Sequence, residues 1–163
     1  MKSLITFTAL AGCVLFAGCA SQPQHTLTTA NQKTEHCKKV SEAEISALFD
    51  RWNESLASGN PSKVVANYAE RSILLPTVSN KVRFRVDDKE DYFAHFLENH
   101  QSGKIDQRFV DIGCNTAMDA GLYTFSFAKT GTSVSGRYSY TYHWDGEQWL
   151  ITSHHSSVMP ETL

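Results

Sequence analysis

The sequence lacks the features of several large functional classes. Its 15 lysines and arginines do not outnumber its 17 aspartates and glutamates, and the formal net charge of -2 argues against a nucleic-acid-binding surface. It contains no Gly-rich nucleotide loop, no His-Arg-Asp and no Asp-Phe-Gly signature, so kinase chemistry is not expected. It also contains neither the nucleophile elbow of a serine hydrolase nor a basic helix of the kind that binds calmodulin.

A long apolar run is missing as well. The N-terminal run, residues 4–16, is shorter than the ~20 apolar residues that a bilayer-spanning helix needs. It follows the basic start at Lys2 and is typical of the hydrophobic region of a signal peptide. The Phe-Ala-Gly-Cys sequence that ends at Cys19 resembles a bacterial lipobox. Residues 1–19 are therefore predicted to be a lipoprotein signal peptide, with Cys19 as the lipidated residue.

Two alternatives for the N-terminus stay open. Cys13 also follows lipobox letters, and the segment could be an ordinary secretory signal or a membrane anchor. We favour Cys19, because cleavage at Cys13 would leave an apolar mature N-terminus. Ala20, rather than aspartate, follows Cys19, which in a Gram-negative cell predicts an exported lipoprotein of the outer membrane that faces the periplasm. Residues 20–37 are polar and are predicted to form a flexible tether. They cannot bury enough apolar surface to offset the conformational entropy that an ordered segment loses.

Cysteines are few, and none of the four lies in a Cys-x-x-Cys motif, which argues against a redox active site. After export and acylation of Cys19, Cys37 and Cys114 remain in an oxidising compartment. Two such thiols form a disulfide more often than they stay free. The sequence therefore predicts a Cys37–Cys114 disulfide, with two separately buried thiols as the alternative.

Helix signals occupy the first half of the remaining domain, residues 38–163. Ser41 and Glu44 form a capping box, and apolar residues follow at helical spacing. Asn60 followed by proline begins a second helix, which is expected to include Tyr68. Asp87 or Asp88 is expected to cap a third helix, whose apolar face contains aromatic residues.

Strand signals follow these helices. A short strand is predicted at residues 73–75, and residues 82–86 alternate between apolar and polar. From Ile105 onward the apolar period is two, and Asp145-Gly146 is a strong hairpin signal, so about four long antiparallel strands are expected. The pattern predicts an α+β fold in which helices pack on one face of a strongly curved antiparallel sheet.

Three stretches together resemble one family. They are Glu-Ile-Ser-Ala-Leu-Phe at residues 44–49, Asp-Tyr-Phe-Ala-His-Phe-Leu at residues 91–97, and Trp-Asp-Gly-Glu-Gln-Trp-Leu-Ile at residues 144–151. In this order they resemble the association domain of calcium/calmodulin-dependent protein kinase II, a nuclear-transport-factor-2-like (NTF2-like) cone. The likeness is to free-standing, exported bacterial versions without a kinase. It implies a homo-oligomer, either a dimer or a ring of dimers, with a ligand pocket.

The resemblance also directs attention to a pocket. In the kinase family arginines in the pocket bind small carboxylates, and Tyr123, Ser139 and Ser156 stand at those positions here. Arg137 is the predicted substitute, with Arg83 and Arg108 as further candidates. The predicted pocket, for a small anionic or carboxylate ligand, consists of Trp52, Tyr68, Tyr92, Phe96, Tyr123, Arg137 and His155.

The tyrosines of the same strand are predicted to lie elsewhere. Tyr138, Tyr140 and Tyr142 are expected to cover the outer face of the sheet and to form a dimer interface. No catalytic residue, metal site or cofactor is assigned. Adjacent His154 and His155 point to opposite faces of a strand, so they cannot jointly bind one metal ion.

The sequence thus predicts a non-kinase oligomerisation and ligand-binding domain anchored in the cell envelope. An enzyme of the ketosteroid isomerase, SnoaL-like cyclase or dehydratase type is the main alternative, with Asp111, Asp119, Tyr92 and Tyr123 as the available acid, base or donor groups. A purely structural oligomer is the third possibility.

Overall fold

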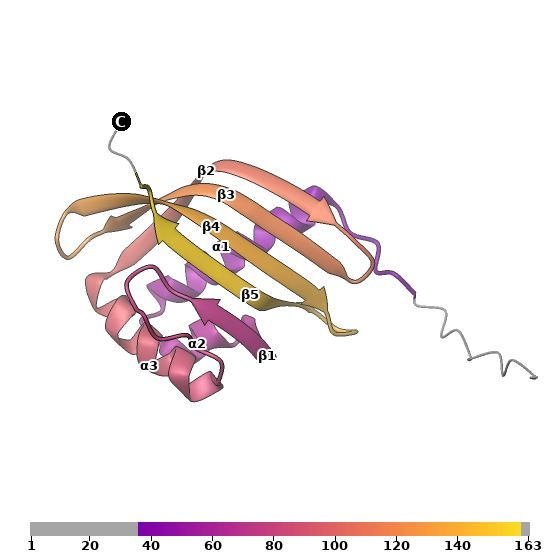
Figure 1. Ribbon diagram of the computed structural model, residues 1–163, viewed down its shortest axis with the longest axis horizontal. Helices are drawn as coiled ribbons and strands as arrows, with labels where there is room; N and C mark the ends of the chain where they lie inside the picture. Colours follow the sequence, from indigo (N-terminus) through magenta and orange to yellow (C-terminus); the bar gives the residue numbers. More distant parts are fainter. Residues whose placement is uncertain (1–35, 161–163) are drawn as a thin grey trace, which may run out of the picture. The chain divides into compact units, whose positions relative to one another are not determined.

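The computed structural model describes residues 36–160, so the predicted signal peptide, the lipidation at Cys19 and almost all of the predicted tether lie outside the described residues. The described part runs from purple to yellow in Figure 1. Its elements follow in the order α1 (Glu42–Ala57), α2 (Pro61–Val65), β1 (Tyr68–Leu75), α3 (Val86–Phe96), the 3-10 helix η1 (Leu97–Asn99), β2 (Gln101–Ile112), β3 (Thr116–Phe127), β4 (Thr132–Trp144) and β5 (Trp149–Val158).

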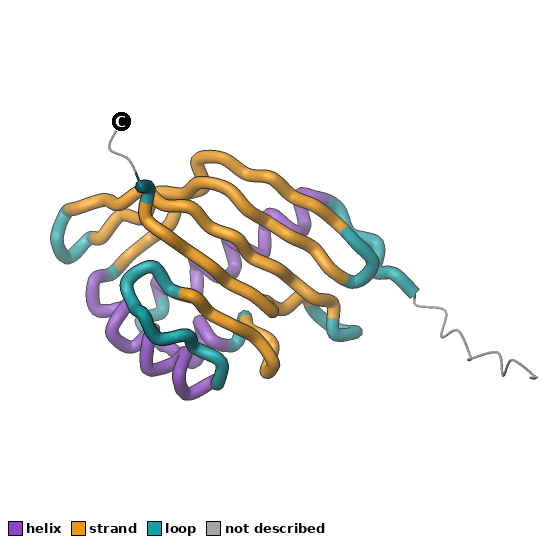
Figure 2. Tube along the Cα trace, in the orientation of Figure 1, coloured by secondary structure: helices purple, strands orange, loops and turns teal. Residues whose placement is uncertain are grey.

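The strands form one curved, five-stranded sheet in the order β1-β5-β4-β3-β2. Strands β2 to β5 pair with their neighbours in antiparallel fashion, whereas β1 pairs with β5 in parallel. The helices lie together on one face of the sheet, as Figure 2 shows in purple against orange. The predicted α+β cone is confirmed, with the difference that β1 makes the sheet mixed rather than wholly antiparallel.

The first helix begins where its capping residues predict. The Ser41 hydroxyl accepts from the Glu44 N–H at 3.3 Å, and the Glu44 carboxylate accepts from the Ser41 N–H at 2.9 Å. The two contacts satisfy backbone donors that a helix N-terminus otherwise leaves free. Four turns then direct Ile45, Phe49 and Trp52 into the core, where each is at most 2% exposed.

Three boundaries differ from the prediction. Tyr68 begins strand β1 instead of ending α2. Of the predicted strand at residues 82–86, residues 82–85 form a loop with a single bridge, between Leu74 and Arg83, and residue 86 begins helix α3. Helix α3 starts at Val86 with Arg85 at the N-cap, so both predicted capping aspartates, at positions 87 and 88, fall within its first turn, where carboxylates favour the helix dipole.

Tyr138, Tyr140 and Tyr142 lie on the concave face, inside the core, and the prediction that they form an outer interface is wrong. Each is at most 2% exposed, and Tyr140 packs against Phe49 and Trp52 of α1. The physical reason is burial: three large rings at a spacing of two remove far more apolar surface from water on the helix side than outside.

The disulfide between Cys37 and Cys114 is present, as predicted. The sulfurs lie 2.09 Å apart, and the Cα atoms are 4.7 Å apart. The bond joins the segment before α1 to the turn between β2 and β3. Next to it, the Lys38 N–H donates to Asn115 Oδ1 at 2.8 Å, so the same two segments are also held by hydrogen bonds.

Candidate functional site

A cavity of about 180 Å³ lies between the concave side of the sheet, helices α1 and α3, and the loop after β1. Aromatic rings form a large part of its wall. The Phe, Trp and Tyr rings come from α1, α3 and β3: Trp52, Tyr92, Phe93, Phe96, Tyr123, Phe125 and Phe127. No charged side chain is among the described residues that line it. The site is therefore built for apolar contact, with few polar groups.

The mouth of the cavity is apolar. Val78, Val134 and Val158 line the cavity and are also exposed, by 77%, 44% and 49%. They come from the loop after β1, from β4 and from β5. Because lining residues that are also exposed mark where a cavity meets solvent, we place the entrance between these three valines.

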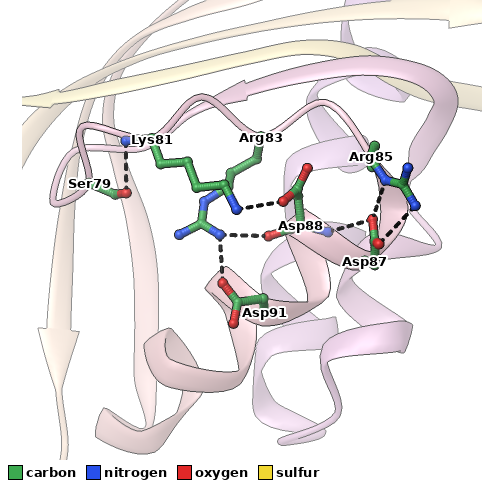
Figure 3. Close-up of polar contacts among 7 residues, drawn as sticks. All are labelled: Ser79, Lys81, Arg83, Arg85, Asp87, Asp88 and Asp91. Atoms are coloured by element: carbon green, nitrogen blue, oxygen red, sulfur yellow. Dashed lines mark hydrogen bonds and ion pairs between the residues drawn. The ribbon is translucent and has the colours of Figure 1, made fainter.

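The loop that carries Val78 is tied to α3 by charged groups, which Figure 3 shows. Arg83 donates to the Asp91 carboxylate at 2.6 Å and to the Asp88 carbonyl at 3.1 Å. Lys81 pairs with the Asp88 side chain at 2.7 Å. Since Arg83 is only 8% exposed, its pairing anchors the loop and so positions the cavity wall.

His154 of β5 is a buried polar group of the wall. It is 4% exposed and stacks on Tyr140 with 4.2 Å between ring centroids. Its Nδ1 atom lies 2.7 Å from the hydroxyl of Tyr68, while Nε2 has no hydrogen-bond partner among the described residues. Burial, together with the nearby His155, lowers the pKa of His154 to about 3, so the ring is neutral at physiological pH.

Three hydroxyl groups form a second polar spot. Thr77 Oγ1 and Ser156 Oγ lie 2.7 Å apart. Burial raises the pKa of Tyr123, and the hydroxyls of Ser156 and Thr77 oppose that rise. Gly136 allows this ring to lie flat against β4, because a Cβ there would stand 2.7 Å from Tyr123 Cε1. These hydroxyls already contact one another, which distinguishes them from the unpartnered His154 Nε2.

The structure brings four of the seven predicted pocket residues into the cavity: Trp52, Tyr92, Phe96 and Tyr123. Tyr68 is buried and is not a lining residue, but its hydroxyl lies 2.7 Å from Nδ1 of His154, which lines the cavity.

The placement of Arg137 and His155 in the pocket is wrong. Both are exposed, and Arg137 donates to Ser157 Oγ at 3.1 Å on the opposite side of the sheet. The reason is strand parity: because the neighbouring Tyr138 and His154 point inward, residues 137 and 155 point outward.

Sequence reasoning missed His154, although a signal for it exists. Tyr140 and His154 are paired residues of neighbouring strands, so they share a face of the sheet. Once the tyrosines of β4 are assigned to the core, His154 must face the core as well. The error in the tyrosine face therefore caused the choice of His155.

The remaining charged candidates do not reach the cavity. Arg108 donates to the buried Asp119 carboxylate at 3.1 Å, and the Tyr138 hydroxyl donates to the same oxygen at 2.8 Å. Burial raises the pKa of Asp119, and these two donors oppose the rise. Neither Asp119 nor Asp111 is a cavity-lining residue, so the acidic groups considered for catalysis are not placed to act there.

Within residues 36–160, no three histidine, cysteine or acidic side chains are grouped so that they could hold a metal ion. None of the helices in this same part of the chain has the length and apolarity needed to cross a membrane.

Comparison with known proteins gives one family. The family model for the calcium/calmodulin dependent protein kinase II association domain matches residues 41–160. A solved structure from Xanthomonas campestris, described as such an association domain, is 43% identical, with a TM-score of 0.71; the match covers 78% of this chain and 98% of that one. No curated protein matches the chain.

More distant solved structures share the fold alone. An NTF2-like protein from Pseudomonas putida is 16% identical, with a TM-score of 0.64 over 75% of this chain and 89% of that one. The iota-carbonic anhydrase of a cyanobacterium, complexed with bicarbonate, is 18% identical, with a TM-score of 0.66 over 76% and 94%.

Proposed function

Because the chain belongs to the calcium/calmodulin-dependent protein kinase II association-domain family, we propose that it is an oligomerisation domain that also binds a small molecule in its aromatic cavity. The observation that carries the ligand-binding part is the cavity itself. It is largely apolar and contains a few polar groups that converge on it, which is the usual form of a small-molecule site. A core built only for packing would fill this space, since protein interiors leave few voids larger than a water molecule.

The lining favours an uncharged ligand. The expectation of a carboxylate ligand depended on Arg137, which lies outside the cavity. Without a cation in the wall, an anion would lose its hydration without gaining a partner of opposite charge. A neutral, mainly aromatic or alicyclic compound meets no such cost.

The volume limits the size of the ligand. An apolar protein cavity of about 150 Å³ is large enough to bind benzene. The present cavity, at about 180 Å³, therefore suits a single substituted ring, and the mouth between the three valines leaves room for a substituent to extend toward solvent.

Assembly and location complete the proposal. The helices cover only one face of the sheet, as Figure 2 shows. Phe109 of the edge strand β2 is 61% exposed and follows Arg108, which points inward to Asp119, so Phe109 lies on the other face. We place the homo-oligomer contact on this open face, since an exposed aromatic side chain favours association. The domain is proposed to be held at the envelope by acylated Cys19, with residues 20–37 as the tether.

Catalysis is supported less well. An acid–base enzyme needs a group whose pKa lies near the working pH and that reaches the substrate. His154 is the titratable imidazole that lines the cavity, and its pKa of about 3 leaves it a poor base or acid at neutral pH.

Calorimetric titration of the full-length protein with α-methylstyrene and with benzoate tests the proposed function. We expect saturable 1:1 binding of the neutral α-methylstyrene and at least tenfold weaker binding of benzoate, because the cavity has no cation. Val134→Trp, which fills the mouth, should abolish binding while the protein stays folded.

Ser133→Trp is the matched control for that variant. It adds the same ring to the adjacent residue of β4, which points to the other face of the sheet. Equal binding by Val134→Trp and wild type, or no binding of α-methylstyrene at all, would contradict the proposed site.

A further inference from the structure

We infer that His154 recognises the polar end of this ligand: Tyr68 fixes the imidazole in the tautomer whose Nε2–H points into the cavity, where it donates to an uncharged oxygen acceptor such as a ketone carbonyl. The inference rests on the proposed function, since it assumes that the cavity holds a ligand. It adds the chemical class of that ligand and the residue that reads it.

The Tyr68 hydroxyl is protonated and can act as a hydrogen-bond donor. Burial raises the pKa of this phenol well above its ordinary value, so the hydroxyl keeps its hydrogen. Among the described residues, His154 Nδ1 is its one hydrogen-bond partner, at 2.7 Å. Either tautomer leaves one buried hydrogen without an acceptor among the described residues: the hydroxyl hydrogen if Nδ1 is protonated, or the Nε2 hydrogen if Nδ1 is bare. Of these two residues His154 lines the cavity and Tyr68 does not, so a ligand can accept the hydrogen of Nε2 but not that of the hydroxyl. The Tyr68 hydroxyl therefore donates to Nδ1.

Trp52 supports the same orientation of that hydroxyl. Its indole N–H lies close enough to the Tyr68 oxygen to lower the pKa of Tyr68, although it does not form a hydrogen bond with good geometry. A donor on that side turns the hydroxyl hydrogen away from Trp52 and toward His154.

The contact with Tyr68 determines the tautomer of His154. A neutral imidazole has one N–H and one bare nitrogen, and each is set by what the other contacts. Because Nδ1 accepts from Tyr68, Nε2 carries the hydrogen. The ring is clamped between Tyr140, stacked at 4.2 Å, and Trp52, edge-on at 5.3 Å, so the direction of the N–H is fixed.

The Nε2–H group of His154 is a buried donor without an acceptor among the described residues. His154 is 4% exposed and lines the cavity, yet its Nε2 contacts no acceptor among the described residues. A buried donor without a partner is costly and is rare in folded proteins. A ligand oxygen that enters the cavity would remove this cost, and a ligand without an acceptor would not.

The uncharged surroundings of His154 favour an uncharged acceptor on the ligand. The donor is a neutral imidazole in a wall without charged residues. A neutral carbonyl oxygen of a ketone, ester or quinone matches such a donor, whereas a carboxylate would bring an uncompensated charge into the same space. The structure thus points to a small cyclic carbonyl compound.

Two probes of nearly equal shape test the inference. Acetophenone and α-methylstyrene differ in having an oxygen or a methylene group at one position, and both carry one ring. The quantity to measure is the ratio of their dissociation constants in the full-length wild type and in His154→Phe, which keeps a ring but has no donor. We expect the variant to lose acetophenone affinity about tenfold, and α-methylstyrene affinity by less than about twofold.

Tyr68→Phe provides a second variant in case His154→Phe does not fold. It retains His154 but removes the hydroxyl that keeps Nδ1 without a hydrogen, so either ring nitrogen can be protonated. Acetophenone affinity should then fall by about threefold or more, while α-methylstyrene affinity is kept. In the wild type, nitrogen-15 chemical shifts of His154 should show a protonated Nε2 and a bare Nδ1.

The outcomes separate the inference from the proposed function. If α-methylstyrene binds and both variants keep the wild-type preference between the probes, the inference is overturned and the proposed function stands. A protonated Nδ1 in the wild type overturns it as well. If neither probe binds the wild type, the proposed function fails, and the inference fails with it.

Discussion

Loss of the Cys37–Cys114 disulfide is expected to lower the free energy of unfolding by about 4.5 kcal/mol. The two cysteines are 77 residues apart in the sequence, so the bond closes most of the domain into one loop. Removing it gives the unfolded chain many more conformations, and the loop-closure entropy grows with the logarithm of loop length. A domain of this size has a total stability of about 5 to 15 kcal/mol, so the loss would be a large part of it.

Urea denaturation of the full-length protein measures this effect. The Cys37→Ser, Cys114→Ser double variant should unfold at a much lower urea concentration than the oxidised wild type, and the reduced wild type should behave like the variant. Ser41→Ala is a useful control, since it removes a helix cap near the same end of the domain and should cost only about 1 kcal/mol. A loss of less than about 1 kcal/mol in the double variant would show that the bond does not constrain the unfolded chain as described.

Acidification is expected to destabilise the wild type through His154 by about 2 to 3 kcal/mol between pH 6.5 and about pH 4.5. The pKa of this imidazole falls from 6.5 in an exposed chain to about 3 in the folded domain, because the buried ring cannot be charged. Below pH 6.5 the unfolded chain therefore binds a proton that the folded chain does not. Stability is complete above pH 6.5 and falls steadily as the pH drops toward 3.

The free energy of unfolding of His154→Phe, measured over the same pH range, should lack this part of the decline. Asp119 titrates in the opposite sense, because burial raises its pKa, but it is present in both proteins and cancels in the comparison. His155→Gln removes the exposed neighbour and should keep most of the wild-type pH dependence. Parallel curves for wild type and His154→Phe would mean that His154 is not buried as a neutral ring.

The local signals in the sequence were sufficient for much of the fold. The capping box depends on two residues close in the sequence, Ser41 and Glu44, and the structure forms it with two hydrogen bonds. The period of two after Ile105 likewise becomes strands β2 to β5. The disulfide could be predicted because only two cysteines remained to pair in the proposed mature chain.

The site depends on information that local patterns do not contain. Alternation shows that Tyr138 and Arg137 face opposite sides of the sheet, but it does not say which side the helices cover. The orientation of the His154 ring is set by strand β1. Its residue Tyr68, 86 positions before His154 in the sequence, places its hydroxyl against Nδ1 of the ring. Neither the parallel pairing of β1 with β5 nor that contact has a signature in the sequence, and so the pocket residues on β4 and β5 were assigned to the wrong face.

A crystal structure of the full-length protein grown with saturating acetophenone would show whether the aromatic cavity holds an uncharged ligand whose oxygen accepts from His154. We expect the ring among Trp52, Phe96 and Tyr123, with the carbonyl oxygen within about 2.7 to 3.2 Å of His154 Nε2. An empty cavity, or a bound ring whose oxygen points away from His154, would contradict it.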